Sequence, residues 1–179
     1  MKMTSETSKI LSKEHKNILK VVDALESEIS ILKDKEIDVN FFKNVIKFIR
    51  NYADRFHHAK EEDILFKEFN KSAEEGCAHC NPVEQMLVEH DEGRREVRMI
   101  ESGLNEMNKD KLIKGADGYI QLIREHIFKE DNILYPMADE ALKDSVKKDM
   151  LKKFREIESK KKKEIKPYLD FVGSLGKRK

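Results

Sequence analysis

Apolar residues recur every three or four positions along most of the chain, which is the spacing of one face of an α-helix. The first such stripe covers about residues 6–33 and consists of Leu11, Ile18, Val22, Leu25 and Ile29. After a polar break at residues 34–38, a second stripe ends near Asn70; its members are Phe42, Ile46, Ile49, Ala53 and Ile64. Each stripe predicts one amphipathic helix.

The second half of the chain predicts two further helices after a polar loop at residues 71–81. Asn81 followed by Pro82 is a typical helix start, with the asparagine as N-cap and the proline at the first helical position. The third stripe consists of Val83, Met86, Val97, Ile100 and Leu104. A break at residues 107–110 precedes the fourth stripe, formed by Leu112, Tyr119, Leu122, Ile123, Ile133 and Met137. We expect Gly115 and Gly118 to weaken this helix and Pro136 to kink or end it.

A fifth stripe begins near Asp144 and consists of Val146, Met150, Phe154, Ile157, Ile165 and Leu169. The run Lys160–Lys163, expected to be a solvated helix face, cuts through it, and we expect Pro167 to limit the helix. The pattern favours an all-α fold, an up-down-up-down four-helix bundle over residues 1–142. Residues 143–179 are expected to add a C-terminal helix that packs on the bundle, with 173–179 as a frayed basic tail.

Composition agrees with an all-helical chain and excludes several functions. The 179 residues include only 7 Gly and 3 Pro, and 40% are charged, which suits amphipathic helices. A net charge of +1 gives no field that would point to nucleic acid or a membrane surface. The first residues lack the apolar segment of a secretory signal, and no apolar stretch of about 18 residues occurs, so we expect a cytoplasmic protein. Both a monomer and a homodimer are compatible with the sequence.

The two cysteines, Cys77 and Cys80, lie in the predicted loop on either side of His79. Two cysteines are too few for a disulfide framework of the kind that small secreted domains use. A lone C-x-x-C leaves three alternatives open, namely a redox dithiol, part of a metal site, or two unrelated thiols.

An internal repeat connects the second and fourth predicted helices. The segments 57–66 and 126–135 match at five of ten positions, and each begins with His-x-x-x-Glu. Each segment also follows a Glu-His pair on the preceding helix, at 14–15 and at 89–90. Two helix pairs of similar design predict packing with approximate two-fold symmetry.

The histidines and glutamates of this repeat are expected on the inner faces of their helices. Residues four apart lie about 40° apart around an α-helix, so each His-x-x-x-Glu motif presents both side chains on the apolar side. Any one of them alone could be a buried histidine with an ordinary partner. Six unpartnered polar groups would cost about 1–3 kcal/mol each, and a metal centre is the simplest way to satisfy them. The candidate ligands are His15, His57, Glu61, His90, His126 and Glu130.

Imidazole and carboxylate ligands suit iron, manganese or zinc, and two glutamates favour a dinuclear site because a carboxylate can bridge two ions. With the sequences Glu-Glu-Asp-Ile-Leu-Phe and Glu-Asp-Asn-Ile-Leu-Tyr-Pro that follow, these motifs resemble those of the hemerythrin-like (HHE cation-binding) proteins over about residues 8–142. The resemblance implies a non-haem di-iron centre, two iron ions bridged by the two glutamates and a solvent-derived oxo or hydroxo group. It pairs His15 with His57 on one iron, and His90 with His126 on the other.

The resemblance further implies that the centre binds or turns over O2, peroxide or NO, in a role connected with oxidative or nitrosative stress. Whether the protein is an enzyme stays open. The alternative is a non-catalytic O2 or redox sensor, or an iron store, with the same centre. A third alternative is a structural bundle filled with zinc. For the protein that binds or turns over a ligand, and for the sensor, the expected partner is a small ligand.

The chain departs from the oxygen-carrying hemerythrins at Arg94, where those proteins have a further histidine. Five ligands per iron would leave an open position on both metals, which argues for redox handling of a small ligand over simple O2 carriage. His58, Tyr52 and Glu62 are candidates to fill a vacancy, although His58 is expected at the bundle edge. Arg94 is expected to form an interhelical ion pair at that edge, or else to pair with a carboxylate near the site.

Overall fold

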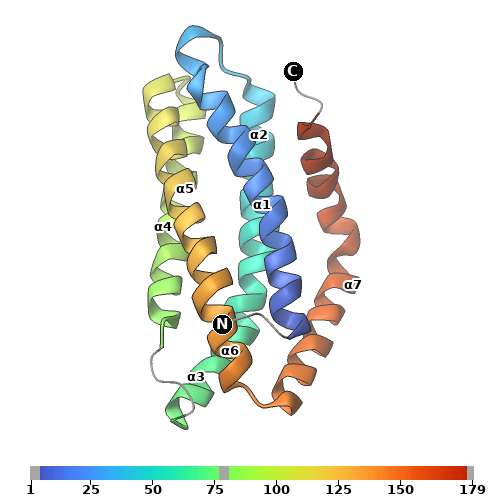
Figure 1. Cartoon of the computed structure of the whole chain (residues 1–179). Helices are drawn as coiled ribbons and strands as arrows, with labels where there is room; N and C mark the ends of the chain where they lie inside the picture. The colour runs from blue at the N-terminus through green and yellow to red at the C-terminus, as the bar shows by residue number, and fades with distance from the viewer. Residues whose placement is uncertain (1–4, 77–80, 177–179) are drawn as a thin grey trace.

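The computed structural model describes residues 5–76 and 81–176, which form helices aligned along one axis and contain no strand (Figure 1). The first helix is α1 (Glu6–Ser30). The second is continuous from α2 (Val39–Phe48) through the π-helical segments Ile49–His58 and Glu61–Leu65 into α3 (Phe66–Glu74). The others are α4 (Val83–Asn105), α5 (Lys109–Lys129) with the π-helical segment Glu130–Leu134 and α6 (Tyr135–Ala141), and α7 (Asp144–Leu175). The all-helical bundle is confirmed, whereas the up-and-down order and the division at residue 142 stay predictions.

Short polar side chains begin several helices. Ser5 accepts a hydrogen bond from the Ser8 amide, and Asn108 accepts one from the Lys111 amide, so each satisfies a free N–H group of the first turn. The expected cap at residue 81 is off by one position, because the N-cap of α4 is Pro82. The Asn81 side chain still accepts from the amide of Val83 at 3.1 Å.

Two predicted helix ends are wrong. The second helix continues past Asn70 to Glu74, since the buried Ser72 hydroxyl donates to the carbonyl of Ala141 at 3.0 Å and ties this last turn to α6. The helix α7 runs through Pro167 to Leu175, so the residues from 173 to 175 are helical. Pro167 lies on the exposed side, where water can satisfy the carbonyl group that the proline leaves without a donor.

The π-helical segments change which side chains face inward. Ile133 was expected on the inner face, yet it is 47% exposed, while Leu134 and Tyr135 are buried. A π-helical turn contains more residues than an α-helical turn, so the segment from 130 to 134 rotates the side chains away from the positions that a 100° step predicts. Pro136 neither ends nor breaks this helix, because it lies in the first turn of α6.

Glycines set the close packing of α4 against α5. A Cβ atom on Gly103 would lie 2.6 Å from the backbone nitrogen of Leu112, and one on Gly115 would lie 2.8 Å from that of Ile100. Gly115 therefore allows the two backbones to approach each other, and its expected weakening of the helix stays a prediction. This contact holds the third and fourth helices of the bundle together.

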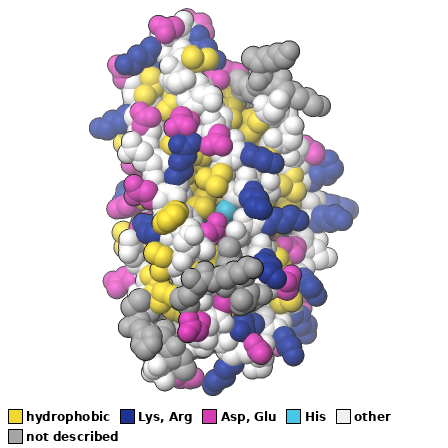
Figure 2. Space-filling view, viewed as in Figure 1, with side chains coloured by type: hydrophobic (Ala, Val, Ile, Leu, Met, Phe, Trp, Pro, Cys, Tyr) yellow, Lys and Arg dark blue, Asp and Glu magenta, His cyan; other side chains and the backbone are white. Residues whose placement is uncertain are grey.

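Apolar side chains form two core clusters, one around Phe42, Phe48 and Ile100 and the other around Phe69 and Tyr135. Buried His15, His57, His90, Glu61 and Glu130 belong to neither cluster, and along their helices they fall between residues of the first cluster and residues of the second. A fifth helix, α7, packs against α1, and Lys and Arg side chains gather along its outer edge (Figure 2). No described helix is both long and apolar enough to span a membrane.

The close contact of α4 with α5 gives a stability prediction. Gly103→Ala should lower the free energy of unfolding by about 1–3 kcal/mol, because the added methyl group would overlap backbone atoms of Leu112. Gly173→Ala is the matched control in α7, since no described atom lies within 4 Å of its added Cβ atom, and it should be neutral or stabilise by up to about 1 kcal/mol. Equilibrium urea unfolding measures both, and equal stability of the two variants would contradict this close backbone packing.

Candidate metal centre

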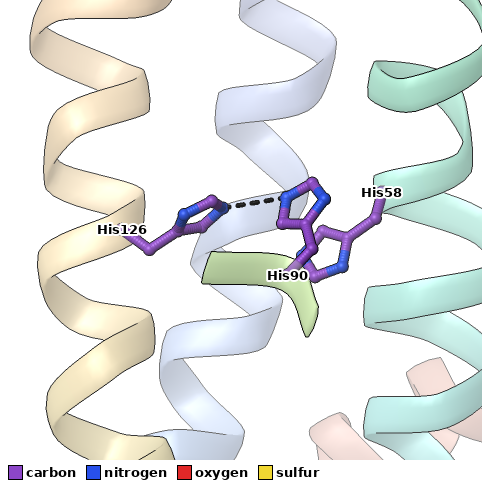
Figure 3. A group of neighbouring side chains, drawn as sticks. All are labelled: His58, His90 and His126. Atoms are coloured by element: carbon purple, nitrogen blue, oxygen red, sulfur yellow. Dashed lines mark hydrogen bonds between the residues drawn. The ribbon is translucent and has the colours of Figure 1, made fainter. Parts of the chain in front are cut away.

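The six expected side chains come together in the middle of the bundle, where all are buried. Together with His58 they form two groups, and within each group one nitrogen or oxygen atom per residue lies within 4.8 Å of the others. The first group is His15, His57, Glu61 and Glu130, and the second is His58, His90 and His126. In the second group Nε2 of His90 lies 3.0 Å from Nε2 of His126, with His58 beside them (Figure 3).

The two glutamates belong to the first group and also contact histidines of the second. The carboxylate oxygens of Glu130 are each 3.2 Å from an Nε2 atom, one on His15 and the other on His126. Those of Glu61 are each 3.6 Å from an Nε2 atom, on His57 and His90. Each carboxylate thus contacts one imidazole of each pair, which is the arrangement that a bridging ligand requires.

The outer nitrogen of each of these four imidazoles contacts a second carboxylate. The Nδ1 contacts are His15 with Asp131 at 3.0 Å, His57 with Glu14 at 2.9 Å, His90 with Glu62 at 2.7 Å, and His126 with Glu89 at 2.9 Å. Such a carboxylate accepts a hydrogen bond from Nδ1–H, orients the ring and turns Nε2 towards the position of a metal. The four rings are therefore held ready as ligands.

Two lysines support these outer carboxylates, and sequence reasoning missed both. The ammonium of Lys60 bonds Glu14, and that of Lys129 bonds Glu89. Lys60 is completely buried, with its nitrogen 4.1 Å from the ring centre of Phe56. Both lysines occupy the matched Lys position of the internal repeat, so the repeat itself contained the signal that could have identified them.

Two of the five positions at which the repeated segments differ bear directly on the centre. Tyr135 donates a hydrogen bond to Glu61 and stacks on His15, with ring centres 5.6 Å apart. The corresponding residue of the other half is Phe66, which stacks on His90 but has no hydroxyl group. Second, His58 corresponds to an isoleucine in the other half and joins the second group. The donors present thus differ between the two sides, with three imidazoles in the second group against two imidazoles and the nearby phenol of Tyr135 in the first. The expected five ligands on each iron stay a prediction.

Not all the candidates for a vacant position face the centre. Tyr52 accepts a hydrogen bond from Asn17 and stacks on Phe48, away from both groups. Glu62 contacts the outer nitrogen of His90, so its role is to orient a ligand. Cys77 and Cys80 lie outside the described residues.

Arg94 forms an ion pair between helices and also pairs with carboxylates near the site, so both expected roles apply. Its guanidinium bonds Asp54 at 2.6 Å and Glu62 at 2.7 Å, which makes it an ion pair between helices. Both carboxylates also contact the second group, Asp54 at 3.6 Å from Nδ1 of His58 and Glu62 on His90. Arg94 thus stabilises the carboxylates that position two imidazoles.

Burial and neighbouring charges shift the pKa values of the side chains at the centre. Burial disfavours a charge on His15 and His126, but the surrounding carboxylates outweigh it and raise the pKa of His15 to about 9 and that of His126 to about 10. Burial, followed by repulsion from Glu130, raises the pKa of the Glu61 carboxyl well above its usual range. Burial and the neighbouring His90 lower the pKa of His58 to about 3.

The donors fit a bound cation. Among the described residues, buried atoms with no hydrogen-bond partner include Nε2 of His57, Oε2 of Glu61 and both carboxylate oxygens of Glu130. Leaving such groups unsatisfied costs free energy, and a metal ion would coordinate all of them. Nitrogen and oxygen donors together suit a transition metal of borderline softness.

Metal binding should release protons. Without metal, His15 and His126 are positively charged at pH 7, because their pKa values are about 9 and about 10. Each must lose its second ring proton to become a ligand, since a ligand imidazole is neutral. We expect that filling both metal positions releases about two protons. The affinity for the metal should therefore rise from pH 7 towards pH 9. Calorimetric titration in buffers of different ionisation enthalpy measures the number, and an affinity independent of pH would contradict these protonation states.

The outer carboxylates give a second prediction. Glu89→Gln should weaken metal binding by about 10- to 100-fold, because the amide cannot hold His126 and Lys129 as a carboxylate does. Glu92→Gln on the same helix is the matched control, since the side chain of Glu92 is 46% exposed and pairs with Arg95 at 3.4 Å. Competition with a chromophoric chelator measures both affinities, and equal affinities would show that Glu89 does not support the centre.

Comparison with known proteins gives one family. Searches of curated proteins and of solved structures find no significant match. The family model described as the hemerythrin HHE cation-binding domain matches residues 7–138, which include both donor groups and their outer carboxylates. The chain therefore belongs to the hemerythrin HHE cation-binding family.

Proposed function

We propose that the protein holds two iron ions and uses them to bind or turn over O2, peroxide or NO, in the response to oxidative or nitrosative stress. The observation that carries the proposal is the pair of adjacent donor groups connected by Glu61 and Glu130, in which Oε2 of Glu61 and both carboxylate oxygens of Glu130 have no hydrogen-bond partner among the described residues. Family membership and the mixture of imidazole and carboxylate donors support iron.

Each part of the donor set has a place in this proposal. His15 and His57 would hold one ion, and His90 and His126 the other, with His58 as a further ligand on that side. The two glutamates, together with an oxygen atom from solvent, would bridge the ions. When bound, iron supplies one-electron redox chemistry that the surrounding side chains do not provide.

The chain's own residues would control that chemistry in two ways. The phenol of Tyr135 donates a hydrogen bond to Glu61 and so fixes the orientation of this carboxylate. The apolar clusters on both sides of the donor layer keep bulk water away, which strengthens electrostatic interactions at the centre. Access for a small ligand must then come through a specific opening.

One observation favours a second candidate, a sensor without turnover. The ammonium of Lys60 lies 5.5 Å from the ring centre of Phe154 on α7 and bonds Glu14, which orients His57. A change at this ligand could therefore be transmitted to α7 by three direct contacts. The iron-store alternative has no such observation in its favour.

Metal content and reactivity test the proposal. The purified protein should contain about two irons per chain, with near-ultraviolet absorption bands that disappear on reduction. His57→Ala should lose iron, whereas Lys67→Ala, whose side chain is 62% exposed, should retain it. Catalytic consumption of peroxide or NO would favour turnover, and stoichiometric binding with a change in oligomeric state would favour the sensor. One zinc or no metal, with no uptake of ferrous iron, would refute both.

A further inference from the structure

A cavity of about 230 Å³ opens on one side of the centre. It lies between the π-helical segment Ile49–His58, α4 and α5, and the buried His58, His90 and His126 line it. Figure 3 shows these three rings converging from their helices. Arg55 and Arg98, which are exposed, lie at its mouth. The cavity thus connects the surface with the second donor group.

The first donor group does not line this cavity and is covered by side chains. Tyr135, completely buried, stacks on His15. Behind His57 lie Glu14 and the buried Lys60, which Phe154 of α7 covers. A ligand that approaches the centre from solvent therefore has its most direct route through the cavity, on the side of His58.

The cavity is larger than O2 or hydrogen peroxide needs. A single water molecule requires about 10–15 Å³ of such volume, so the cavity admits a molecule with several non-hydrogen atoms. Much of the wall is apolar and consists of Ile49, Val97, Leu122 and Ile123. Such a wall favours an alkyl group, because burying apolar surface is favourable.

Two arginines of the cavity wall, both partly exposed, are already paired with carboxylates. Arg94 is paired with Asp54 and Glu62, and Arg50 is paired with Glu101 at 2.6 Å. A neutral ligand therefore fits this region better than an anion, which would have to compete with carboxylates that are already in place.

Two polar atoms in the wall have no hydrogen-bond partner among the described residues, Nδ1 of His58 and the hydroxyl oxygen of Tyr119. The hydroxyl of Tyr119 is buried without a hydrogen bond, and the residue is only 2% exposed. Its ring carbon Cε2 lies 3.7 Å from the position of a Cβ atom on Gly93, about one helical turn beyond His90. Burial raises the pKa of Tyr119, so the hydroxyl stays neutral and can donate. It is available for an acceptor atom on a ligand bound close to the imidazoles.

We propose that this cavity binds a short-chain organic hydroperoxide, with its oxygen atoms beside the second donor group and within reach of the Tyr119 hydroxyl, and its alkyl group against Val97 and Leu122. The inference rests on the proposed function, because it names the class of peroxide that the same centre takes. Reduction of such a ligand cleaves its O–O bond with two electrons and two protons and leaves an alcohol and water. The electrons come from the two ferrous ions of the loaded protein.

The test compares two peroxides on the reduced, iron-loaded protein by stopped-flow absorbance. Val97→Phe narrows the cavity and should slow oxidation by tert-butyl hydroperoxide at least about 10-fold, with oxidation by hydrogen peroxide changed less than about 3-fold. Leu87→Phe on the same helix is the matched control, because Leu87 is 39% exposed and does not line the cavity. It should leave both rates unchanged.

Tyr119→Phe provides a second variant that removes one oxygen atom and leaves the ring. It should slow oxidation by tert-butyl hydroperoxide about 5- to 10-fold without loss of iron or stability, since the hydroxyl has no partner in the described part of the chain. Saturation-transfer NMR with tert-butyl alcohol gives a readout apart from reactivity. The methyl signal should respond with the wild-type protein and disappear with Val97→Phe.

The outcomes separate this inference from the proposed function. Equal slowing of both peroxides by Val97→Phe, or reaction with hydrogen peroxide alone, would overturn the inference and leave the di-iron function standing. An iron-loaded protein that reacts with neither peroxide, nor with O2 or NO, would overturn the proposed function itself.

Discussion

The contact between each imidazole and its outer carboxylate is the interaction on which this molecule depends. Four helices place histidines in one buried layer, and a buried imidazole that is free to turn would point its lone pair in any direction. Asp131, Glu14, Glu62 and Glu89 each fix one ring through Nδ1, so that the Nε2 atoms face one another. The remaining structure serves this layer, with apolar clusters above and below it and lysines that neutralise two of the outer carboxylates.

The internal repeat gives the layer its two-fold pattern. The positions at which the two repeats differ make one side of the layer unlike the other. Tyr135 and α7 close one side, whereas His58 and the cavity lie on the other. Two metal positions built from matching motifs would therefore differ in their donors and in their access to solvent. Small changes in a duplicated helix pair, a hydroxyl on one ring and an imidazole in place of an isoleucine, are enough to distinguish them.

Much of this architecture could be predicted from the sequence, because helical stripes and His-x-x-x-Glu spacing depend only on local geometry. Four of the six candidate ligands follow from residues four apart on an apolar face, and His15 and His90 follow from their place within an apolar stripe. His58 was assigned to the bundle edge because a 100° step assumes an α-helix, whereas Ile49–His58 is π-helical. Tyr135 was missed for the same reason. The outer carboxylates were not predictable, since pairing Glu14 with His57 requires knowing how two helices are set against each other.

The donors of the centre span the chain from His15 to Glu130, and each of the first four helices of the bundle contributes at least one. No short segment of the chain can therefore assemble the site by itself, and the ligand layer exists only when distant parts of the chain are already packed. Metal ions would consequently bind late in folding. They would stabilise the completed fold rather than start its formation. In a cell, metal supply would then decide how much of the newly made protein persists in its folded form.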